Sequence, residues 1–267
     1  MQITDRVFVV TGGGNGMGRE VVLGLLQRGA HVAALDLSEA GLAETVELSG
    51  NAQRLTTHVV DVTDRKAVAK LPAAVEKAHG AVDGVLNVAG IIQPFVKIQD
   101  LDFDVIERVM NVNFWGVVNM SKAFLPTLLA RPEAALLNVS SMGGFLPVPG
   151  QAAYGASKAA VKLFTEALFA ELQGTSVAVT VVFPGGVGTN ITANSGVEIK
   201  NMDELTAGKQ PKTTSPADAG RQIIEGVEKG AFRVVIGSDA KFMDRFSRFS
   251  PRRATLLIAD RMKALLG

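Results

Sequence analysis

Short apolar runs alternate with longer segments of helical character along the chain, and this alternation constrains the fold more than any other feature. The runs expected to be strands are Val7–Val10, His31–Leu35, Leu55–Val60, Val82–Val88, Ala135–Val139, Val177–Phe183 and Arg233–Ile236. Helices are expected between them, for example over Gly16–Arg28, Asp64–His79 and Gln151–Leu172. Apolar strands that alternate with helices are typical of a parallel sheet covered on both faces. The sequence therefore predicts an α/β fold with a doubly wound, Rossmann-like sheet of about seven strands.

Two segments look less regular than the rest, Gly185–Thr214 and the last thirty residues. Ligands of doubly wound sheets bind beyond the carboxyl ends of the strands, so the segment after the sixth strand is expected to cover a site. Residues 238–267 are expected to form a C-terminal helical extension. Ser215-Pro216 and Ser250-Pro251 each place a capping hydroxyl before a proline, a pattern typical of helix starts.

Composition narrows the classes of function. Lys and Arg number 27 against 26 Asp and Glu, so the chain lacks the basic excess typical of nucleic-acid-binding proteins. There is no cysteine, which excludes disulfides and thiolate chemistry. His31, His58 and His79 show no metal-ligand spacing and are expected at the surface or at strand edges. Without a signal-peptide pattern or a run of roughly 18 apolar residues, a soluble protein of the reducing cytoplasm is expected.

The first expected strand runs into a glycine-rich turn, Thr11-Gly12-Gly13-Gly14-Asn15-Gly16-Met17-Gly18. Its spacing is T-G-x-x-x-G-x-G, which differs from G-x-G-x-x-G, and no Lys-Ser/Thr follows it as in a P-loop. Glycines in such a turn let the backbone approach a pyrophosphate at the N-terminus of the next helix. Glycine-rich turns also occur without a ligand, but this position between a strand and a helix favours a dinucleotide site.

An acidic residue, Asp36, ends the second expected strand, about 20 residues beyond the turn. A carboxylate there can bind the ribose hydroxyls of NAD, and it would repel the 2′-phosphate of NADP. No Arg or Lys lies in the turn before Arg19 or beside Asp36. The pattern favours NAD; the alternative for Asp36 is an acid at a helix N-terminus.

Tyr154 and Lys158 lie at positions i and i+4 of an expected helix and therefore on one face. The pKa of a free tyrosine is about 10, and a nearby ammonium favours the phenolate and lowers that pKa. Such a pair can exchange a proton with a substrate oxygen near neutral pH. The spacing alone is common, so the interpretation depends on its context.

That context consists of five landmarks in order along the chain. They are the glycine turn at Thr11–Gly18, Asn87-Val88-Ala89-Gly90 after the fourth strand, Asn113 within Val112–Gly116, Ser141 thirteen residues before Tyr154, and Pro184-Gly185-Gly186-Val187-Gly188-Thr189 after the sixth strand. On these landmarks the chain resembles the short-chain dehydrogenase/reductase family in its single-domain form. The resemblance implies that residues 1–267 form one dinucleotide-binding and catalytic domain.

The resemblance also implies the catalytic residues, Asn113, Ser141, Tyr154 and Lys158. Ser141 would orient the substrate oxygen and Tyr154 would exchange the proton. Lys158 would lower the pKa of Tyr154 and hold the nicotinamide ribose, while Asn113 would anchor a water that links Lys158 to solvent. Structural alternatives are that Ser141 simply ends a strand and that Asn113 bridges backbone.

The contacts expected with NAD follow from the glycine turn and from the resemblance. Asp61 matches the position that contacts adenine, and Thr189 the one that binds the nicotinamide carboxamide. Asn87 has a scaffold role between strands as an alternative. The full set is Gly12, Gly14, Asn15, Gly16, Met17, Gly18, Asp36, Leu37, Asp61, Val62, Asn87, Ala89, Gly90, Tyr154, Lys158, Pro184, Gly185, Val187 and Thr189.

These features predict an oxidoreductase that moves hydride between NAD(H) and an alcohol/carbonyl substrate. The alternatives are a non-catalytic NAD(H)-binding or sensing module on the same fold, an NADP-dependent carbonyl reductase, and a lyase or epimerase of the same family. The expected pocket walls are Gly143–Gln151 and Ala193–Thr206. Apolar residues there favour a hydrophobic secondary alcohol or ketone: Phe145, Leu146, Val148, Ile191 and Val197.

The expected helix Gln151–Leu172 is apolar around much of its circumference, which predicts burial on more than one side. Family members commonly pair through this helix, so the resemblance implies a homodimer or homotetramer.

The tail carries Phe242, Phe246 and Phe249 at helical spacing among basic residues, followed by a second apolar stripe at Ile258, Met262 and Leu265. A membrane-surface helix pair is one interpretation. Packing against the core or a neighbouring subunit is favoured, because three acidic residues dilute the basic face: Asp239, Asp244 and Asp260.

Overall fold

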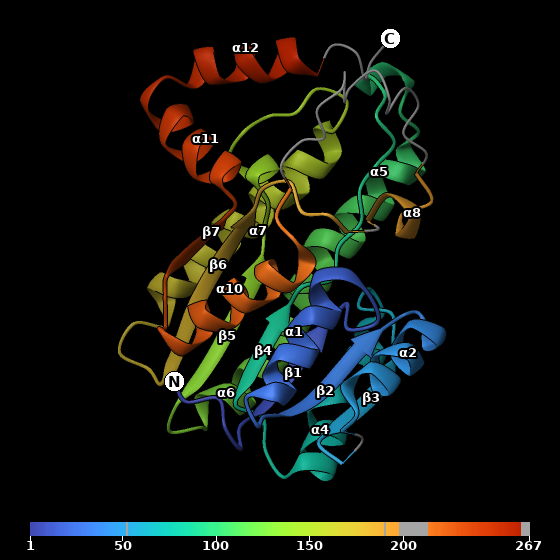
Figure 1. Cartoon of the computed structure of the whole chain (residues 1–267), viewed down its shortest axis with the longest axis vertical. Coiled ribbons are helices and arrows are strands. Elements are labelled where there is room, and N and C mark those ends of the chain that lie inside the picture. Colours follow the sequence, from blue (N-terminus) through green and yellow to red (C-terminus); the bar gives the residue numbers. More distant parts are fainter. Residues whose placement is uncertain (52, 190, 198–212, 263–267) are drawn as a thin grey trace.

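A parallel sheet organises the molecule (Figure 1). The computed structural model describes residues 1–51, 53–189, 191–197 and 213–262. The strands are β1 (Val7–Thr11), β2 (His31–Asp36), β3 (Leu55–Val59), β4 (Gly84–Asn87), β5 (Ala134–Val139), β6 (Val177–Pro184) and β7 (Arg233–Ile236). Their order is β3-β2-β1-β4-β5-β6-β7, and every neighbouring pair is parallel. The predicted doubly wound, Rossmann-like architecture is confirmed.

Helices connect the strands. They are α1 (Gly16–Gln27), α2 (Glu39–Ser49), α3 (Arg65–Val68), α4 (Leu71–His79), α5 (Phe103–Met110), α6 (Gly116–Leu129), α7 (Ala152–Glu171), α8 (Ile191–Asn194), α10 (Pro216–Glu228), α11 (Ser238–Phe249) and α12 (Pro251–Arg261). The described residues also form three short turns: η1 (Ile98–Asp100), η2 (Asn111–Trp115, a π-helical turn) and η3 (Met142–Gly144).

Side chains of each strand alternate between two apolar layers, as a pleated strand requires. In β1, Phe8 and Val10 face one layer, and Val7 and Val9 face the other. The first layer is covered by α1 and α10, which lie side by side in Figure 1. The second is covered by α4, α6 and α7. Burial on both faces explains why the strands read as continuous apolar runs.

The strand order reverses between β1 and β4, and the carboxyl ends of these strands form the position where doubly wound folds bind ligands. Thr11 and Asn87 are register partners at that edge. The Oγ1 atom of Thr11 accepts hydrogen bonds from the backbone N–H groups of Val88 and Ala89. This contact fixes the loop after β4 beside the glycine turn.

One expected helix is two helices in the structure. The segment Asp64–His79 forms α3 and α4 with a break between them. Pro72 has no backbone N–H and is tolerated in the first turn of a helix but not inside one, so α4 begins at Leu71. The carboxylate of Asp64 caps α3 by accepting from the N–H groups of Lys66 and Ala67.

In the C-terminal segment, α11 and α12 are described as far as Met262, and Leu265 lies outside the described residues. Ser215 caps α10 through its hydroxyl, as expected. Contrary to expectation, Ser250 does not cap α12 with its side chain; its backbone N–H donates to the carbonyl of Phe246 at the end of α11. Among the described helices, none has the length and apolar character that crossing a membrane requires.

Candidate active site

The glycine turn leaves room for a ligand because side chains are absent where the backbone comes close. Gly12 has a φ of +74°, and a Cβ on it would lie 3.0 Å from the Cα of Ala89. A Cβ on Gly18 would clash with the carbonyl of Gly12. Asn15 begins α1, and its Oδ1 accepts from the N–H of Gly16 at 2.6 Å. The turn and the N-terminus of α1 together form a cradle that fits a dinucleotide pyrophosphate.

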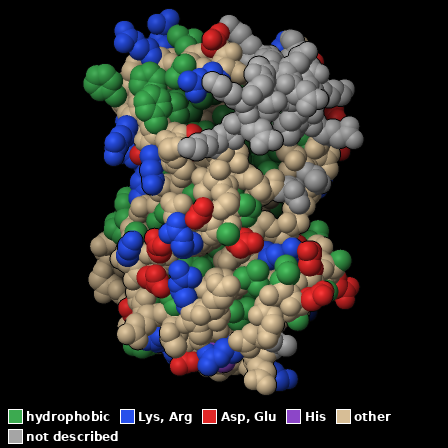
Figure 2. All heavy atoms as spheres, in the orientation of Figure 1, with side chains coloured by type: hydrophobic (Ala, Val, Ile, Leu, Met, Phe, Trp, Pro, Cys, Tyr) green, Lys and Arg blue, Asp and Glu red, His purple; other side chains and the backbone are tan. Residues whose placement is uncertain are grey.

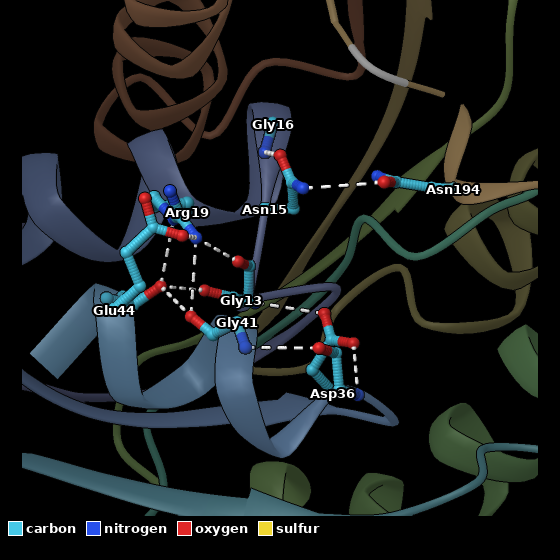
Figure 3. Close-up of polar contacts among 11 residues, drawn as sticks. Gly13, Asn15, Gly16, Arg19, Asp36, Gly41, Glu44 and Asn194 are labelled. Carbon is cyan, nitrogen blue, oxygen red and sulfur yellow. Dashed lines mark hydrogen bonds and ion pairs between the residues drawn. The ribbon is translucent and has the colours of Figure 1, made fainter. Parts of the chain in front are cut away.

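Asp36 holds this turn from the end of β2 (Figure 3). One carboxylate oxygen accepts from the N–H of Gly14 at 2.9 Å, and the other accepts from the N–H of Ser38 at 2.9 Å. The next residue, Leu37, is exposed. The carboxylate thus lies at the rim of the cradle, where the sequence predicts a contact with the ribose of the cofactor.

Arg19 is a residue that the sequence analysis used only as a boundary of the turn. Its guanidinium donates to the carbonyl oxygens of Gly14 and Gly41 and pairs with Glu44 at 2.6 Å (Figure 3). Its Nε donates to the buried hydroxyl of Thr45. A basic side chain therefore does reach the glycine turn, but it is engaged in holding α2 against it. The sequence carried no signal for this, because α2 approaches the turn only in the fold.

Some of the remaining residues expected to contact the cofactor around the first four strands have structural roles, and others are exposed. Asn87 joins β4 to β5 by donating to the Oδ1 of Asn138 at 2.8 Å, which is the scaffold role foreseen as an alternative. Met17 packs against the core below the turn. Asp61 is exposed after β3, and its carboxylate accepts from the N–H of Thr63. Val62 lies beside Gly116, at the start of α6.

Ser141 and Tyr154 meet at the end of β5. The Oγ of Ser141 accepts from the N–H of Gly143 and so begins η3. A Cβ on Gly143 would lie 3.5 Å from that Oγ and 3.3 Å from Cε1 of Tyr154, so these groups surround one point. Tyr154 lies in the first turn of α7 and forms a side-chain hydrogen bond with Ser141.

Lys158 and Asn113 meet one helical turn further on. Lys158 is buried, and its Nζ donates to the carbonyl of Val139 at 3.0 Å. A Cβ on Gly90 would lie 3.0 Å from that Nζ and 3.2 Å from Oδ1 of Asn113. The amide of Asn113 exchanges two hydrogen bonds with the backbone of Ile91 and donates to Ser157. It bridges backbone, as the structural alternative foresaw, and its water-anchoring role stays a prediction.

Burial has the largest effect on the pKa values of Lys158 and Tyr154, which both lie in α7. Burial lowers the pKa of Lys158 to about 8, because the charged form loses its hydration. Burial also raises the pKa of Tyr154 above its usual value, and the hydrogen bond with Ser141 acts in the opposite direction with less effect. The pKa of Tyr154 is therefore raised here and not lowered, because desolvation outweighs the hydrogen bond with Ser141; the effect of Lys158 on this pKa stays a prediction.

Gln93 is a second residue that the sequence analysis missed. Its side chain is fully buried, and its Oε1 accepts from the backbone N–H of Tyr154 at 3.0 Å. Its Nε2 donates to the carbonyl of Gly150, and its own carbonyl accepts from Nε2 of Gln151. Gln93 therefore fixes the first turn of α7 from the loop after β4. A lone glutamine about sixty residues before Tyr154 forms no sequence pattern that would predict this contact.

The loop after β6 closes the far side of the cradle. Pro184 ends β6, and the N–H of Gly185 donates to the carbonyl of Ile236. The N–H of Gly186 donates to Asp239 at 2.8 Å. Val187 packs against the core, while a Cβ on Gly16 would lie 3.4 Å from Cγ2 of Thr189. Thr189 thus faces the glycine turn, as its expected contact with the cofactor requires.

The expected pocket walls are only partly free to meet a substrate. Phe145 and Leu146 pack into a cluster with α11 and α12, and Phe145 also lies against Phe183. Val148 and Ile191 are partly exposed, whereas Val197 is buried. Residues 198–206 lie outside the described residues.

Comparisons with known proteins agree with this geometry. A family model described as short chain dehydrogenase matches residues 6–199. SadH of Mycobacterium tuberculosis, whose name describes it as an oxidoreductase, is 39% identical over 263 residues, covering 95% of this chain and 94% of its own.

Two solved structures from Burkholderia have the same fold. A short-chain dehydrogenase/reductase from Burkholderia phymatum, in complex with NAD, superposes with a TM-score of 0.86 at 23% identity over 94% of this chain and 96% of its own. One from Burkholderia cenocepacia, in complex with NADP, gives 0.81 at 26% identity over 97% and 99%. With its glycine cradle, its Ser141, Tyr154 and Lys158 cluster and these relatives, the chain belongs to the short-chain dehydrogenase/reductase family of nicotinamide-dependent oxidoreductases.

Proposed function

We propose that the protein is an NAD-dependent dehydrogenase or reductase that acts on a hydrophobic secondary alcohol or on the corresponding ketone. The observation that carries the proposal is the meeting of Ser141 and Tyr154 at one point, with Lys158 one helical turn behind, beside the glycine cradle. A sensing module has no need for this cluster, since cofactor binding alone requires only the cradle and its rim.

The proposed roles follow from the positions of the side chains. Ser141 and Tyr154 hydrogen-bond the substrate oxygen, and the raised pKa of Tyr154 keeps its phenol protonated, ready to donate to a carbonyl oxygen. The bound nicotinamide supplies or accepts the hydride. Below a pH of about 8, Lys158 is an ammonium that stabilises negative charge on the tyrosine oxygen after the proton has left. In the oxidation direction the same groups act in reverse.

NAD is the proposed cofactor because of Asp36. Its carboxylate is held at the rim of the cradle by two backbone N–H groups, so it cannot easily turn away from a 2′-phosphate. The nearest basic side chain of α1, Arg19, is paired with Glu44 and so is partly neutralised. The solved relatives include complexes with either cofactor, so the preference of this chain rests on its own residues.

The hydrophobic substrate is proposed from the apolar side chains of the expected pocket walls. Among these, Val148 and Ile191 are partly exposed. Met142, which begins η3, packs against the same cluster as Phe145. The wall segment Gly143–Gln151 contains no charged residue.

The test of the catalytic assignment is Tyr154→Phe. It is expected to lower kcat with an alcohol and ketone panel by at least ~10²-fold, the usual contribution of general acid–base catalysis, while NADH still binds. NADH fluorescence reports binding and NADH absorbance reports turnover. Unchanged turnover in Tyr154→Phe would refute the assignment, and no turnover of any compound by the wild-type protein, with binding intact, would favour the sensing module.

The test of the cofactor is Asp36→Asn, which keeps one acceptor oxygen and removes the charge. The preference for NAD over NADP in kcat/KM is expected to fall by at least about 5-fold, because like charges near a protein surface repel by about 1 to 4 kcal/mol. Glu39→Gln, an exposed acid in the first turn of α2, is the control and should leave the preference unchanged. A wild-type preference for NADP would contradict the proposal.

A further inference from the structure

The two C-terminal helices present large apolar side chains to solvent. Phe249 is 89% exposed, Phe242 is 59% exposed and Leu256 is 54% exposed. Phe242 and Phe249 are seven residues apart, about two helical turns, and so share one face of α11. Figure 2 shows hydrophobic side chains gathered over α11, with Lys and Arg side chains around them. Single exposed apolar residues are ordinary, but a group of them marks an interaction surface.

The opposite face of the helix pair already packs against the body of the protein. Met243 and Ala254 are buried in one cluster with Leu146, which follows η3. Phe246, Leu257 and Ile258 pack against the same cluster. Packing against the core therefore accounts for these residues, while Phe242, Phe249 and Leu256 stay exposed on the outer face, where Phe242 stacks on the ring of Phe246.

Basic side chains accompany the apolar ones on this outer face. Arg245 lies between Phe242 and Phe249 at helical spacing, and Arg252 and Arg253 lie one turn before Leu256 on α12. All three arginines are exposed. Within the part of the chain that the structure describes, no carboxylate is within ion-pair distance of them, whereas Arg248 pairs with Asp244.

Two of the three acidic residues of the helix pair are turned away from this face. Asp239 accepts from the N–H of Gly186 in the loop after β6. Asp244 is 15% exposed and pairs with Arg233 of β7. The sequence-based argument that these acids dilute a basic face is therefore wrong for Asp239 and Asp244, and only Asp260 is exposed. Asp260 follows Leu256 by one helical turn on α12, but Arg245, Arg252 and Arg253 outnumber it, so the outer face is apolar with an excess of basic side chains.

We propose that the outer face of α11 and α12 docks the protein onto an anionic membrane surface. Phe242, Phe249 and Leu256 enter the interface between headgroups and acyl chains, and Arg245, Arg252 and Arg253 bind the anionic headgroups. The charge of the face selects this occupant, since a second copy of the same surface would bring the arginines of one copy towards those of the other. The proposal does not depend on the hydride-transfer reaction.

Vesicle flotation of the full chain tests the proposal. Vesicles of phosphatidylcholine alone are compared with vesicles that also contain phosphatidylglycerol, each at low and high salt. The protein is expected to float with the anionic vesicles, less so at high salt because salt screens the attraction. Arg252→Glu with Arg253→Glu is expected to weaken binding at least ~10-fold, since each basic residue near such a surface contributes about a factor of five. Phe242→Ser with Phe249→Ser should weaken it similarly.

Matched controls are Lys66→Glu with Lys70→Glu, which makes the same change in net charge on exposed positions near α3, and Phe103→Ser, which removes an exposed phenylalanine of α5. Both should bind vesicles like the wild-type protein, and circular dichroism should show every variant folded. The proposal is overturned if the wild-type protein does not bind anionic vesicles, or if the control variants lose binding as much as the tail variants. It is also overturned if light scattering shows that the phenylalanine variants alone split an oligomer, since the face would then join two copies.

Discussion

Lys158 lies at a buried position, where loss of hydration disfavours its charged form and lowers the stability of the fold. Its side chain is buried, its Nζ donates to the carbonyl of Val139, and burial lowers its pKa to about 8. Below that pH the folded chain must bury an ammonium that the unfolded chain keeps hydrated. The residue therefore makes sense as part of the proposed reaction rather than of the core.

Lys158→Met is expected to stabilise the fold while it removes activity. At pH 7 the variant should be more stable by up to about 3 kcal/mol, at about 1.4 kcal/mol for each unit of the pKa shift. The wild-type penalty is full below pH 8 and disappears as the pH rises to the ordinary lysine pKa, so the two proteins should converge there. Urea unfolding between pH 7 and pH 10 measures this, with Lys162→Met, which removes a half-exposed ion pair with Glu166, as the control. A less stable variant at pH 7 would contradict the prediction.

At the scale of elements, the first turn of α7 has no side-chain cap of its own. Gln151 stands before the helix without a capping hydrogen bond, and the N–H of Tyr154 is instead satisfied by Gln93 from the loop after β4. A helix end that is capped from a distant loop couples the position of Tyr154 to that loop. Gln93 is therefore a positioning residue in this structure.

Gln93→Leu is expected to destabilise the protein by about 1 to 3 kcal/mol, because it leaves the N–H of Tyr154 and the carbonyl of Gly150 without partners. Turnover should fall through kcat rather than through the affinity for NADH, since the cradle is untouched. Gln93→Glu keeps the acceptor for Tyr154 and should restore part of kcat. Gln173→Leu, which removes an exposed glutamine at the end of α7, serves as the control. Equal losses in the Leu and Glu variants would show that the contact with Tyr154 does not matter.

The three histidines are scattered in the sequence but lie together beside β3. The Oγ1 of Thr56 contacts the Nε2 atoms of His58 and His79, and the ring centroids of His31 and His79 are 5.8 Å apart. Burial lowers the pKa values of His58 and His79, and the neighbouring histidines lower that of His79 further. They lie at the edge of the sheet, as the sequence predicted for strand-edge residues.

These two histidines are expected to make the fold sensitive to acid. Because their folded pKa values are below the unfolded value of about 6.5, the stability they contribute is present above that pH and is lost as the pH falls below it. His58→Gln with His79→Gln should flatten the decrease in the free energy of unfolding between pH 7 and pH 5. Lys77→Gln, exposed on α4, should leave it as in the wild-type protein. A decrease that is equally steep in the double variant would rule the histidines out.

At the scale of the whole molecule, one face of α7 remains exposed although it is apolar. Its residues recur every three or four positions and carry no charge: Ala152, Ala156, Ala159, Leu163 and Ala167. Leu163 alone is 67% exposed. Small residues in such a row allow another helix to approach closely, so the homodimer or homotetramer that the resemblance implies remains our prediction for this face.

Ala159→Glu and Leu163→Glu are each expected to convert the oligomer to a monomer, because a carboxylate would be buried without a partner when the two helices pack. Light scattering at micromolar concentration measures the mass. Leu48→Glu, which makes the same change at an exposed leucine of α2, should leave the mass unchanged. A wild-type protein that is already monomeric would reject the prediction.

The sequence by itself determined the positions of the seven strands, the parallel, doubly wound class of the sheet and the glycine turn. These depend on apolar periodicity and on local spacing, which neighbouring residues in the chain encode. The set of Ser141, Tyr154 and Lys158 came from the ordered motifs of the family resemblance. Helix boundaries were less certain, because Pro72 divides a segment whose apolar pattern is continuous.

Only the tertiary structure decided which atoms meet across long intervals of sequence. Gln93 caps the helix of Tyr154, Arg19 binds α2 to the turn, and Asp239 turns inward and leaves a cationic outer face. It also decided the direction in which the pKa of Tyr154 shifts, since desolvation raises that pKa more than the hydrogen bond with Ser141 lowers it. Hydrogen bonding and loss of hydration depend on neighbours in space, and those neighbours are assigned by the packed fold rather than by the order of residues.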